Sequence, residues 1–315
     1  MKFQKILMVG VSESSLDPEC WTRLDALADR INKLPKESPE IKKHLADTNC
    51  LLTGFGVTVN KEMMDAAPKL KYVGVLATAY GKVDTDYAKK KGIVVCNIPG
   101  YSTEAVAEFV FAVLLEHIRE LERGKKQTRE GNYSQAGFTA SEIKDKTFGV
   151  LGLGRIGGRV AEIATGFGAD VRYWSKNRKM ELEQKGIKYE DVDVMIPKCD
   201  ILSLHLAQTK ETENFLNERR IQSIKKGAIV INTVPMELVD IDALEKRLRN
   251  GDMTFILDHS DEMSADELKM LSKHKNCIIY PPIAYVTGEA RIQKQEIFVG
   301  NIEAFLSGRP QNTVN

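Results

Sequence analysis

A glycine-rich turn carries the clearest chemical signal in this sequence. The apolar residues 147–151 lead into Gly152, Gly154 and Gly157, which have the spacing G-x-G-x-x-G, and a helix-like segment follows. Between a strand and a helix, such glycines allow a tight turn and let backbone N–H groups approach a pyrophosphate at the positive end of the helix dipole. We therefore predict a dinucleotide-binding turn, with a plain glycine-rich turn as the alternative.

The residues about 20 positions beyond the glycines predict which form of the cofactor is bound. A fold that prefers NAD carries an acidic side chain there, which holds the ribose 2′-hydroxyl. Ser175 occupies this position, and Lys176, Arg178 and Lys179 follow it. Without the carboxylate a 2′-phosphate is no longer repelled, and the cations can pair with it. We favour NADP(H) and keep NAD(H) as the alternative; a solvated basic turn would also explain the cations.

The elements around the turn follow an alternating order of strands and helices. The candidate strands of the N-terminal part are residues 5–10, 50–53, 72–76 and 93–97. The same rhythm resumes from residue 147. This order predicts an α/β fold with two Rossmann-like domains built on doubly wound parallel sheets. Residues 21–34 are expected to form one helix, and residues 125–146 a solvated connection.

Composition narrows the class of protein. The chain has 315 residues, 43% of them hydrophobic, with 45 basic and 44 acidic side chains. The balanced charge predicts no general attraction to nucleic acid or to a membrane surface. The five cysteines are scattered without a C-x-x-C pair, so neither a disulfide framework nor a metal site is predicted, and a cytoplasmic location fits best. No apolar run approaches the about 18 residues of a membrane span.

Further motifs occur in a fixed order along nearly the whole chain. They are residues 92–108 (GIVVCNIPGYSTEAVAE), 204–212 (LHLAQTKET), 231–233 (INT) with 238–240 (LVD), 257–258 (LD) and 281–287 (PPIAYVT). Together with the GxGRIG turn, this series resembles the D-isomer-specific 2-hydroxyacid dehydrogenases, the family that contains glyoxylate/hydroxypyruvate reductases and phosphoglycerate dehydrogenase. The resemblance implies an oxidoreductase that acts on a small-molecule substrate.

The resemblance also implies a division of labour along the chain. Residues 1–99 with 288–315 would form a flavodoxin-like substrate domain, and residues 100–287 a dinucleotide-binding Rossmann domain. The helix at residues 105–118, which is apolar on nearly every side, would lie at the contact between domains and between the subunits of a homodimer.

Binding residues follow from the same resemblance. The backbone N–H groups of Ala77, Thr78 and Ala79 would hold the substrate carboxylate, with Tyr80 beside them. Arg155 and Ile156 would lie along the pyrophosphate. The adenosine side would be lined by Leu206, Ala207 and Thr212, and the nicotinamide by Thr233, Val234 and Asp258.

The chain departs from the family where the chemistry takes place. The family uses an arginine to clamp the substrate, a histidine to move a proton and a glutamate to tune that histidine. Aligning the motifs puts Pro235 at the arginine position, Pro282 at the histidine position and Asp261 at the glutamate position. Because proline has no group that donates a hydrogen bond or carries a proton, we do not expect ordinary reduction of a 2-keto acid.

Three side chains are tentative replacements for the missing catalytic groups: His259, Tyr285 and Asp261. Each has a structural alternative, namely a packed histidine, a packed aromatic ring and a surface carboxylate. We favour a reductase with altered chemistry that acts on a carbonyl, an imine or an activated alkene. The alternatives are a catalytically silent NAD(P)-binding sensor or scaffold, and an ordinary glyoxylate/hydroxypyruvate reductase.

Overall fold

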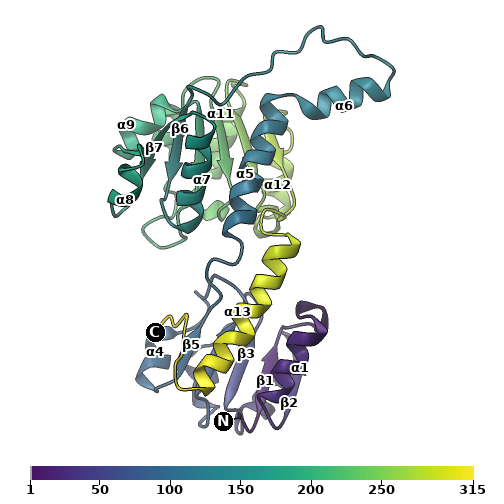
Figure 1. Ribbon diagram of the computed structural model, residues 1–315, viewed down its shortest axis with the longest axis vertical. Helices are drawn as coiled ribbons and strands as arrows, with labels where there is room; N and C mark the ends of the chain where they lie inside the picture. Colours follow the sequence, from purple (N-terminus) through teal and green to yellow (C-terminus); the bar gives the residue numbers. More distant parts are fainter. Residues whose placement is uncertain (1) are drawn as a thin grey trace. The chain divides into compact units, whose positions relative to one another are not determined.

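Two parallel β-sheets organise the chain, each in its own unit. The computed structural model describes residues 2–315 (Figure 1). Unit 1 contains the residues up to Ser102 and those from Thr287 to the C-terminus, and unit 2 contains Thr103–Val286. The predicted fold class, with two α/β units built on parallel sheets, is confirmed.

Unit 1 has a five-stranded sheet in the order β2-β1-β3-β4-β5. The strands are β1 (Ile6–Val9), β2 (Ile31–Leu34), β3 (Cys50–Thr53), β4 (Tyr72–Val75) and β5 (Val94–Cys96). The helices are α1 (Pro18–Ala26), α2 (Ile41–Leu45), α3 (Lys61–Asp65), α4 (Thr85–Lys90) and α13 (Gly288–Leu306). Every residue of β1, β3 and β4 is buried, as expected for a parallel sheet covered by helices on both faces. The order is that of flavodoxin-like folds.

The predicted helix at residues 21–34 is wrong in its second half. Helix α1 ends at Ala26, and Ile31–Leu34 form the edge strand β2, which pairs in parallel with β1. Asn32 and Lys33 give this strand little β propensity of its own. The backbone hydrogen bonds of β2 are made with the free edge of β1, and that edge exists only in the folded sheet.

Unit 2 has a seven-stranded parallel sheet in the order β12-β11-β10-β9-β6-β7-β8. The strands are β6 (Thr147–Leu151), β7 (Asp170–Trp174), β8 (Lys188–Tyr189), β9 (Ile201–Leu204), β10 (Ile229–Asn232), β11 (Thr254–Leu257) and β12 (Cys277–Ile279). The helices are α5 (Thr103–Ile118), α6 (Leu121–Arg129), α7 (Arg155–Gly166), α8 (Met180–Glu183), α9 (Val192–Met195), α10 (Glu218–Ser223), α11 (Ile241–Leu248) and α12 (Ala265–Leu271). The strand order reverses between β6 and β9, and parallel sheets of this kind bind ligands at the carboxyl edge beside that point.

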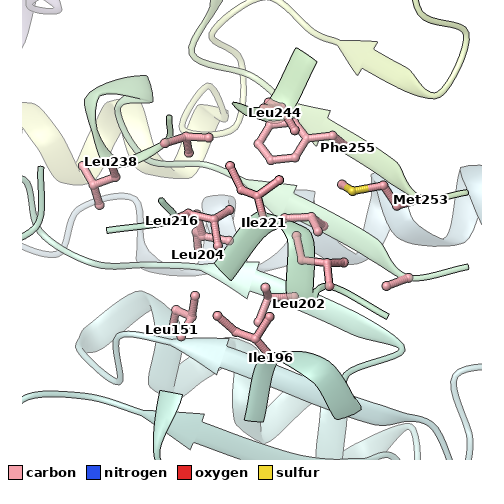
Figure 2. Close-up of a cluster of buried hydrophobic side chains, with 14 of the residues drawn as sticks. Leu151, Ile196, Leu202, Leu204, Leu216, Ile221, Leu238, Leu244, Met253 and Phe255 are labelled. Atoms are coloured by element: carbon pink, nitrogen blue, oxygen red, sulfur yellow. The ribbon is translucent and has the colours of Figure 1, made fainter. Parts of the chain in front are cut away.

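Apolar side chains cover both faces of the unit 2 sheet. Figure 2 shows one cluster, in which Leu151, Leu202 and Leu204 of the central strands pack against side chains from the following helices. On the other face, Val110 and Leu114 of α5 pack with Phe148 and the helix α7. Most of the apolar surface of α5 is therefore buried by its own unit.

The predicted connection at residues 125–146 is largely exposed to solvent, and its first residues belong to α6, which extends to Arg129. The helix has no buried residue, and an i,i+3 ion pair between Glu122 and Lys125 (2.8 Å) stabilises it. Helix α6 and the segment after it extend away from the body of unit 2 (Figure 1). None of the helices within residues 2–315 combines the length and the apolar character needed to cross a membrane.

Candidate functional site

The three glycines of the turn after β6 have three different surroundings. Gly152 has a φ of +95°, and a Cβ there would lie 2.6 Å from the carbonyl oxygen of His205. A Cβ on Gly157 would lie 1.9 Å from the carbonyl oxygen of Gly152. By contrast, a Cβ on Gly154 would meet no atom within 4 Å. The packing of the chain therefore requires glycine at positions 152 and 157. Gly154 instead leaves open space at the place where dinucleotide-binding folds hold the pyrophosphate.

The N-terminus of α7 faces this open space. Gly154 is the N-cap, so no side chain caps the helix, and its first turn contains no acidic residue. The N–H groups of Arg155, Ile156 and Gly157 donate to no acceptor within residues 2–315. An anion at this place would accept hydrogen bonds from these N–H groups, and the positive end of the helix dipole would stabilise its charge. The turn fits the pyrophosphate of a dinucleotide.

The segment after β7 holds the residues expected at the adenosine ribose. The Ser175 hydroxyl donates to the carbonyl oxygen of Asn177 (2.5 Å), which fixes the local turn. Lys176 pairs with Glu211 (2.7 Å). Arg178 pairs with Glu183 (Nε to Oε1, 3.0 Å), and this contact raises the pKa of the guanidinium. A 2′-phosphate would therefore compete with two carboxylates of the chain for these cations.

The Lys176–Glu211 pair spans the carboxyl end of β6. Lys176 follows β7 and Glu211 lies in the loop after β9, and β6 is the strand between these two in the sheet. Both side chains are about three-quarters exposed, at 75% and 73%. The pair thus crosses the edge of the sheet at the level of the glycine turn.

The loop after β9 is held by its own hydrogen bonds. The Thr212 hydroxyl donates to the carbonyl oxygen of Ala207 (2.7 Å) and accepts from the N–H of Thr209 (2.8 Å). Leu206 packs against the apolar cluster of Figure 2. His205 contacts the Ser203 hydroxyl through Nε2 (2.8 Å), and burial lowers its pKa to about 3. This histidine is neutral at physiological pH and supports the loop.

Two buried polar atoms lie after β10 and β11. The Thr233 hydroxyl and the Oδ1 atom of Asp258 have no hydrogen-bond partner within residues 2–315. Asp258 is only 2% exposed, its Oδ2 atom accepts from the N–H of Ala284 (3.0 Å), and burial raises the pKa of its carboxyl. Asn232 fixes the neighbouring turn by donating to the carbonyl oxygen of Val234 (2.8 Å). Since buried polar atoms are rarely unpaired, a ligand amide fits here.

In unit 1, a row of backbone N–H groups follows β4. The N–H groups of Thr78, Ala79 and Tyr80 donate to no acceptor within residues 2–315. The Thr78 hydroxyl donates to the carbonyl oxygen of Ile98 (3.1 Å), and Asn97 donates to the carbonyl oxygen of Thr78 (2.7 Å). These contacts hold the segment while leaving its N–H groups for an anion.

Residues 111–284, more than half of the chain, match the family described as D-isomer specific 2-hydroxyacid dehydrogenase, NAD binding domain. This chain belongs to the D-isomer-specific 2-hydroxyacid dehydrogenase family. The resemblance inferred from the sequence motifs is confirmed, and the glycine turn lies in the NAD-binding domain of an oxidoreductase of this family.

Relatives of this dehydrogenase-family chain cover nearly all of its length. It is 36% identical to a glyoxylate reductase of Thermococcus litoralis over 297 residues, 90% of this chain and 89% of that protein. A D-lactate dehydrogenase of Aquifex aeolicus, solved with NAD and lactic acid, has 30% identity and a TM-score of 0.84 over 96% of both chains. An acyclic imino acid reductase, solved with NADPH and D-Arg, has 29% identity and a TM-score of 0.85 over 98% of this chain and 100% of its own.

In this dehydrogenase-family chain, the segments after β10 and β12 each contain proline. Pro235 precedes a 3-10 turn (Met236–Leu238), and Pro282 lies in a loop closed by a bond from the N–H of Ile283 to the carbonyl oxygen of Pro281 (2.7 Å). The Tyr280 hydroxyl donates to Glu116 on α5 (2.6 Å), and burial with this carboxylate raises the pKa of the tyrosine. No local sequence signal marks Tyr280 as part of such a contact.

The three tentative catalytic residues are not connected in this dehydrogenase-family chain. His259 lies 3.4 Å from Glu262; burial alone lowers its pKa, but Glu262, Asp258 and Asp261 outweigh burial and raise it. Asp261 is exposed in a 3-10 turn (Ser260–Glu262), and Tyr285 is 42% exposed. Within residues 2–315, no hydrogen bond or ion pair joins any of the three to another.

Proposed function

We propose that this protein is an NADP(H)-dependent reductase whose substrate is a small 2-imino acid. One observation carries the proposal: unit 2 keeps two buried, unpaired polar atoms suited to a nicotinamide amide, on Thr233 and Asp258, while Pro235 and Pro282 offer no proton donor. In our interpretation these prolines stand at the positions of the family's arginine and histidine. On this interpretation the chain keeps the groups that bind the cofactor and lacks the family's proton-transfer groups.

An imine suits a site without a proton donor. The bound reduced cofactor supplies a hydride. A ketone that accepts a hydride becomes an alkoxide and requires a proton from the protein, a contribution of about 10²–10⁴-fold in rate. An iminium carbon that accepts a hydride becomes a neutral amine, because the C=N π electrons become the nitrogen lone pair. The proton was taken up from solvent before reduction, so no residue has to deliver it.

The similarity to an acyclic imino acid reductase solved with NADPH and D-Arg supports this choice of substrate and cofactor. The absence of an acid at Ser175, with Lys176, Arg178 and Lys179 after it, supports NADP(H) over NAD(H). NAD(H) is the alternative, because Glu211 and Glu183 already neutralise two of these cations.

We propose roles for the remaining residues on the same basis. The cofactor-binding set comprises Gly152, Gly154, Arg155, Ile156, Gly157, Ser175, Lys176, Arg178, Leu206, Ala207, Thr212, Thr233, Val234 and Asp258. Residues Ala77 to Tyr80 would bind the substrate carboxylate. If the substrate were instead a carbonyl or an activated alkene, a proton donor would be needed. His259 would then be the best of the three candidates, because the acids around it favour its protonated form.

The domain roles and the oligomeric state are part of the proposal. Residues 1–99 with 288–315 would be the substrate domain, and residues 100–287 the cofactor domain, in a homodimer. The exposed Leu121 of α6 (49%) and Tyr133 (83%), on the segment that extends from unit 2, support a subunit contact there. Sedimentation equilibrium tests this, and a monomer at all concentrations would contradict it.

Two experiments test the function. Fluorescence titration with NADPH and with NADH is expected to give tighter binding of NADPH, and tighter NADH binding would refute the cofactor proposal. For the reaction, NADPH oxidation is followed with pyruvate or glyoxylate in the presence and absence of ammonium. We expect turnover only with ammonium, with the amino acid identified by mass spectrometry. Turnover of the keto acids without ammonium at ordinary rates of about 1–10³ s⁻¹ would show that Pro235 and Pro282 do not prevent keto-acid reduction.

A catalytically silent NAD(P)-binding protein is the second candidate. The two prolines favour it as well, because they remove proton transfer without affecting the glycine turn. NADPH binding without oxidation by any keto acid, imine or activated alkene would support this candidate over a reductase.

A further inference from the structure

Helix α13 of unit 1 carries a lysine, Lys294, near the middle of its length. Lys294 is partly buried, and within residues 2–315 it forms no ion pair. Its ammonium group lies 5.7 Å from the centre of the Tyr101 ring, and burial lowers its pKa. The neighbouring cation Arg291, one turn earlier, is instead paired with Asp17. A half-buried ammonium without a counter-ion is unfavourable unless an anion joins it.

The path of α13 across the sheet fixes which edge Lys294 faces. Near the end of the helix, Phe305 packs on Tyr72, the first residue of β4 (ring centres 4.9 Å apart). One turn earlier, Asn301 donates to the carbonyl oxygen of Asn97, just after β5 (2.8 Å). The helix therefore runs from the carboxyl ends of the strands to their amino ends, as the ribbon of unit 1 also shows (Figure 1).

Lys294 lies on the same face of α13 as Asn301 and closer to the start of the helix. Seven residues are two turns and about 10.5 Å, and they return to nearly the same direction. Lys294 is thus carried beyond the carboxyl end of β5, which agrees with its contact to Tyr101. The same edge holds the N–H row of Thr78–Tyr80, since Asn97 bonds both Asn301 and Thr78.

We propose that Lys294 binds the carboxylate of the substrate together with the N–H groups of Thr78–Tyr80. The inference rests on the proposed function in assuming a small carboxylic acid as substrate. The lysine supplies a cation for the carboxylate from within unit 1. One ammonium group and a row of N–H donors match the single charge and the two oxygens of a carboxylate, and the Tyr101 ring shields the pair from water.

The first test distinguishes a loss of substrate binding from a loss of folding. Lys294→Met keeps the length and the apolar part of the side chain, and its KM for the 2-imino acid is expected to rise about 10–100-fold, with a smaller change in kcat. Lys294→Arg should recover part of the loss. NADPH affinity and Tm should not change. The matched control is Lys33→Met, which removes another lysine that lies over an aromatic ring, Trp21 (3.7 Å), on the same unit.

The second test does not depend on turnover. Trinitrobenzenesulfonate labels lysines of lowered pKa first, and oxamate is a carboxylate that cannot be reduced. Peptide mapping should show Lys294 labelled early and protected by oxamate, and Lys33 unprotected. Protection without any imine turnover would refute the proposed reaction and support the carboxylate site. Imine turnover with an unchanged KM in Lys294→Met, or labelling of Lys294 that oxamate does not slow, would overturn the site.

Discussion

The glycine turn after β6 and the proline-containing loops after β10 and β12 follow strands of one sheet, yet they differ in what their chemistry depends on. At the glycine turn the groups available to a ligand are backbone N–H groups. The fold excludes a side chain at Gly157, where a Cβ would lie only 1.9 Å from the carbonyl oxygen of Gly152. In our proposed function, the proline loops stand where the chemistry of the family depends on side chains. The backbone at these two prolines is ordinary. Within residues 2–315, neither Pro235 nor Pro282 follows a cis peptide bond or has a positive φ.

Under the proposed function, the difference would explain how a cofactor site can persist while the reaction changes. A backbone site is protected because almost any substitution at Gly152 or Gly157 collides with the chain. A side-chain site is open to replacement because the fold does not require the reactive group. Variants that introduce the family's side chains at Pro235 and Pro282, or that change the residues proposed to bind the cofactor, test this comparison.

The largest effect is expected from restoring the family's side chains. In the double variant Pro235→Arg/Pro282→His, the reduction of glyoxylate without ammonium should rise about 10²–10⁴-fold, because a proton donor and a carboxylate clamp are added. Steady-state kinetics with NADPH measure this. Each single variant is the control and should gain much less. No gain, in a double variant that binds NADPH normally, would mean that these positions are not the catalytic ones.

The next effect concerns the retained glycines. Gly157→Ala should lower the free energy of unfolding by about 3 kcal/mol, because the new Cβ overlaps the carbonyl oxygen of Gly152. Gly154→Ala should leave the stability unchanged and weaken NADPH binding, since its Cβ enters only the open space. Gly166→Ala, also without a neighbour within 4 Å, is the control for both. Equal Tm values for Gly157→Ala and Gly154→Ala would contradict this account of the turn.

A smaller effect is expected at the nicotinamide end. Asp258→Asn should weaken NADPH binding about 10-fold, because a buried acceptor for the ligand amide is changed. It should also stabilise the free protein near neutral pH. Burial raises the folded-state pKa of Asp258 above 3.8, so its favourable contribution is complete below 3.8 and is lost as the pH rises through the raised value.

The pH dependence of the free energy of unfolding tests this prediction. The stability of Asp258→Asn relative to the wild type should grow as the pH rises from acid to neutral, measured by urea unfolding at a series of pH values. A difference that shrinks with rising pH would mean that the ionised carboxylate is stabilised in the fold.

The smallest effect is expected at the adenosine end. Glu211→Gln frees Lys176 for a 2′-phosphate, and it should tighten NADPH binding by up to about 5-fold while leaving NADH binding nearly unchanged, because exposed ion pairs contribute only about 0.2–1 kcal/mol. Glu122→Gln, which breaks another exposed lysine pair on α6, is the control. Titrations at low salt measure both. If NADPH binding did not change and NADH binding weakened, Glu211 would be a ligand of the ribose hydroxyl.

Local sequence determined the glycine turn, the strands around it and the class of fold. Glycine spacing and buried apolar runs act over a few residues, so they are readable before the chain is folded. The same residues predicted the family, which the relatives confirm. The roles of the individual site residues and the preference for NADP(H) stay predictions, because they depend on atoms of a ligand as well as on the chain.

Tertiary structure alone decided the rest. Residues Ile31–Leu34 became a strand because β1 offered an edge. Tyr280 found Glu116 164 residues away, and Lys176 found Glu211 across the end of β6. Lys294 met Tyr101 only because α13 returns along the sheet of unit 1. Such contacts join side chains that are distant in the chain, and their energies depend on burial and on neighbouring charge, neither of which a single segment of sequence encodes.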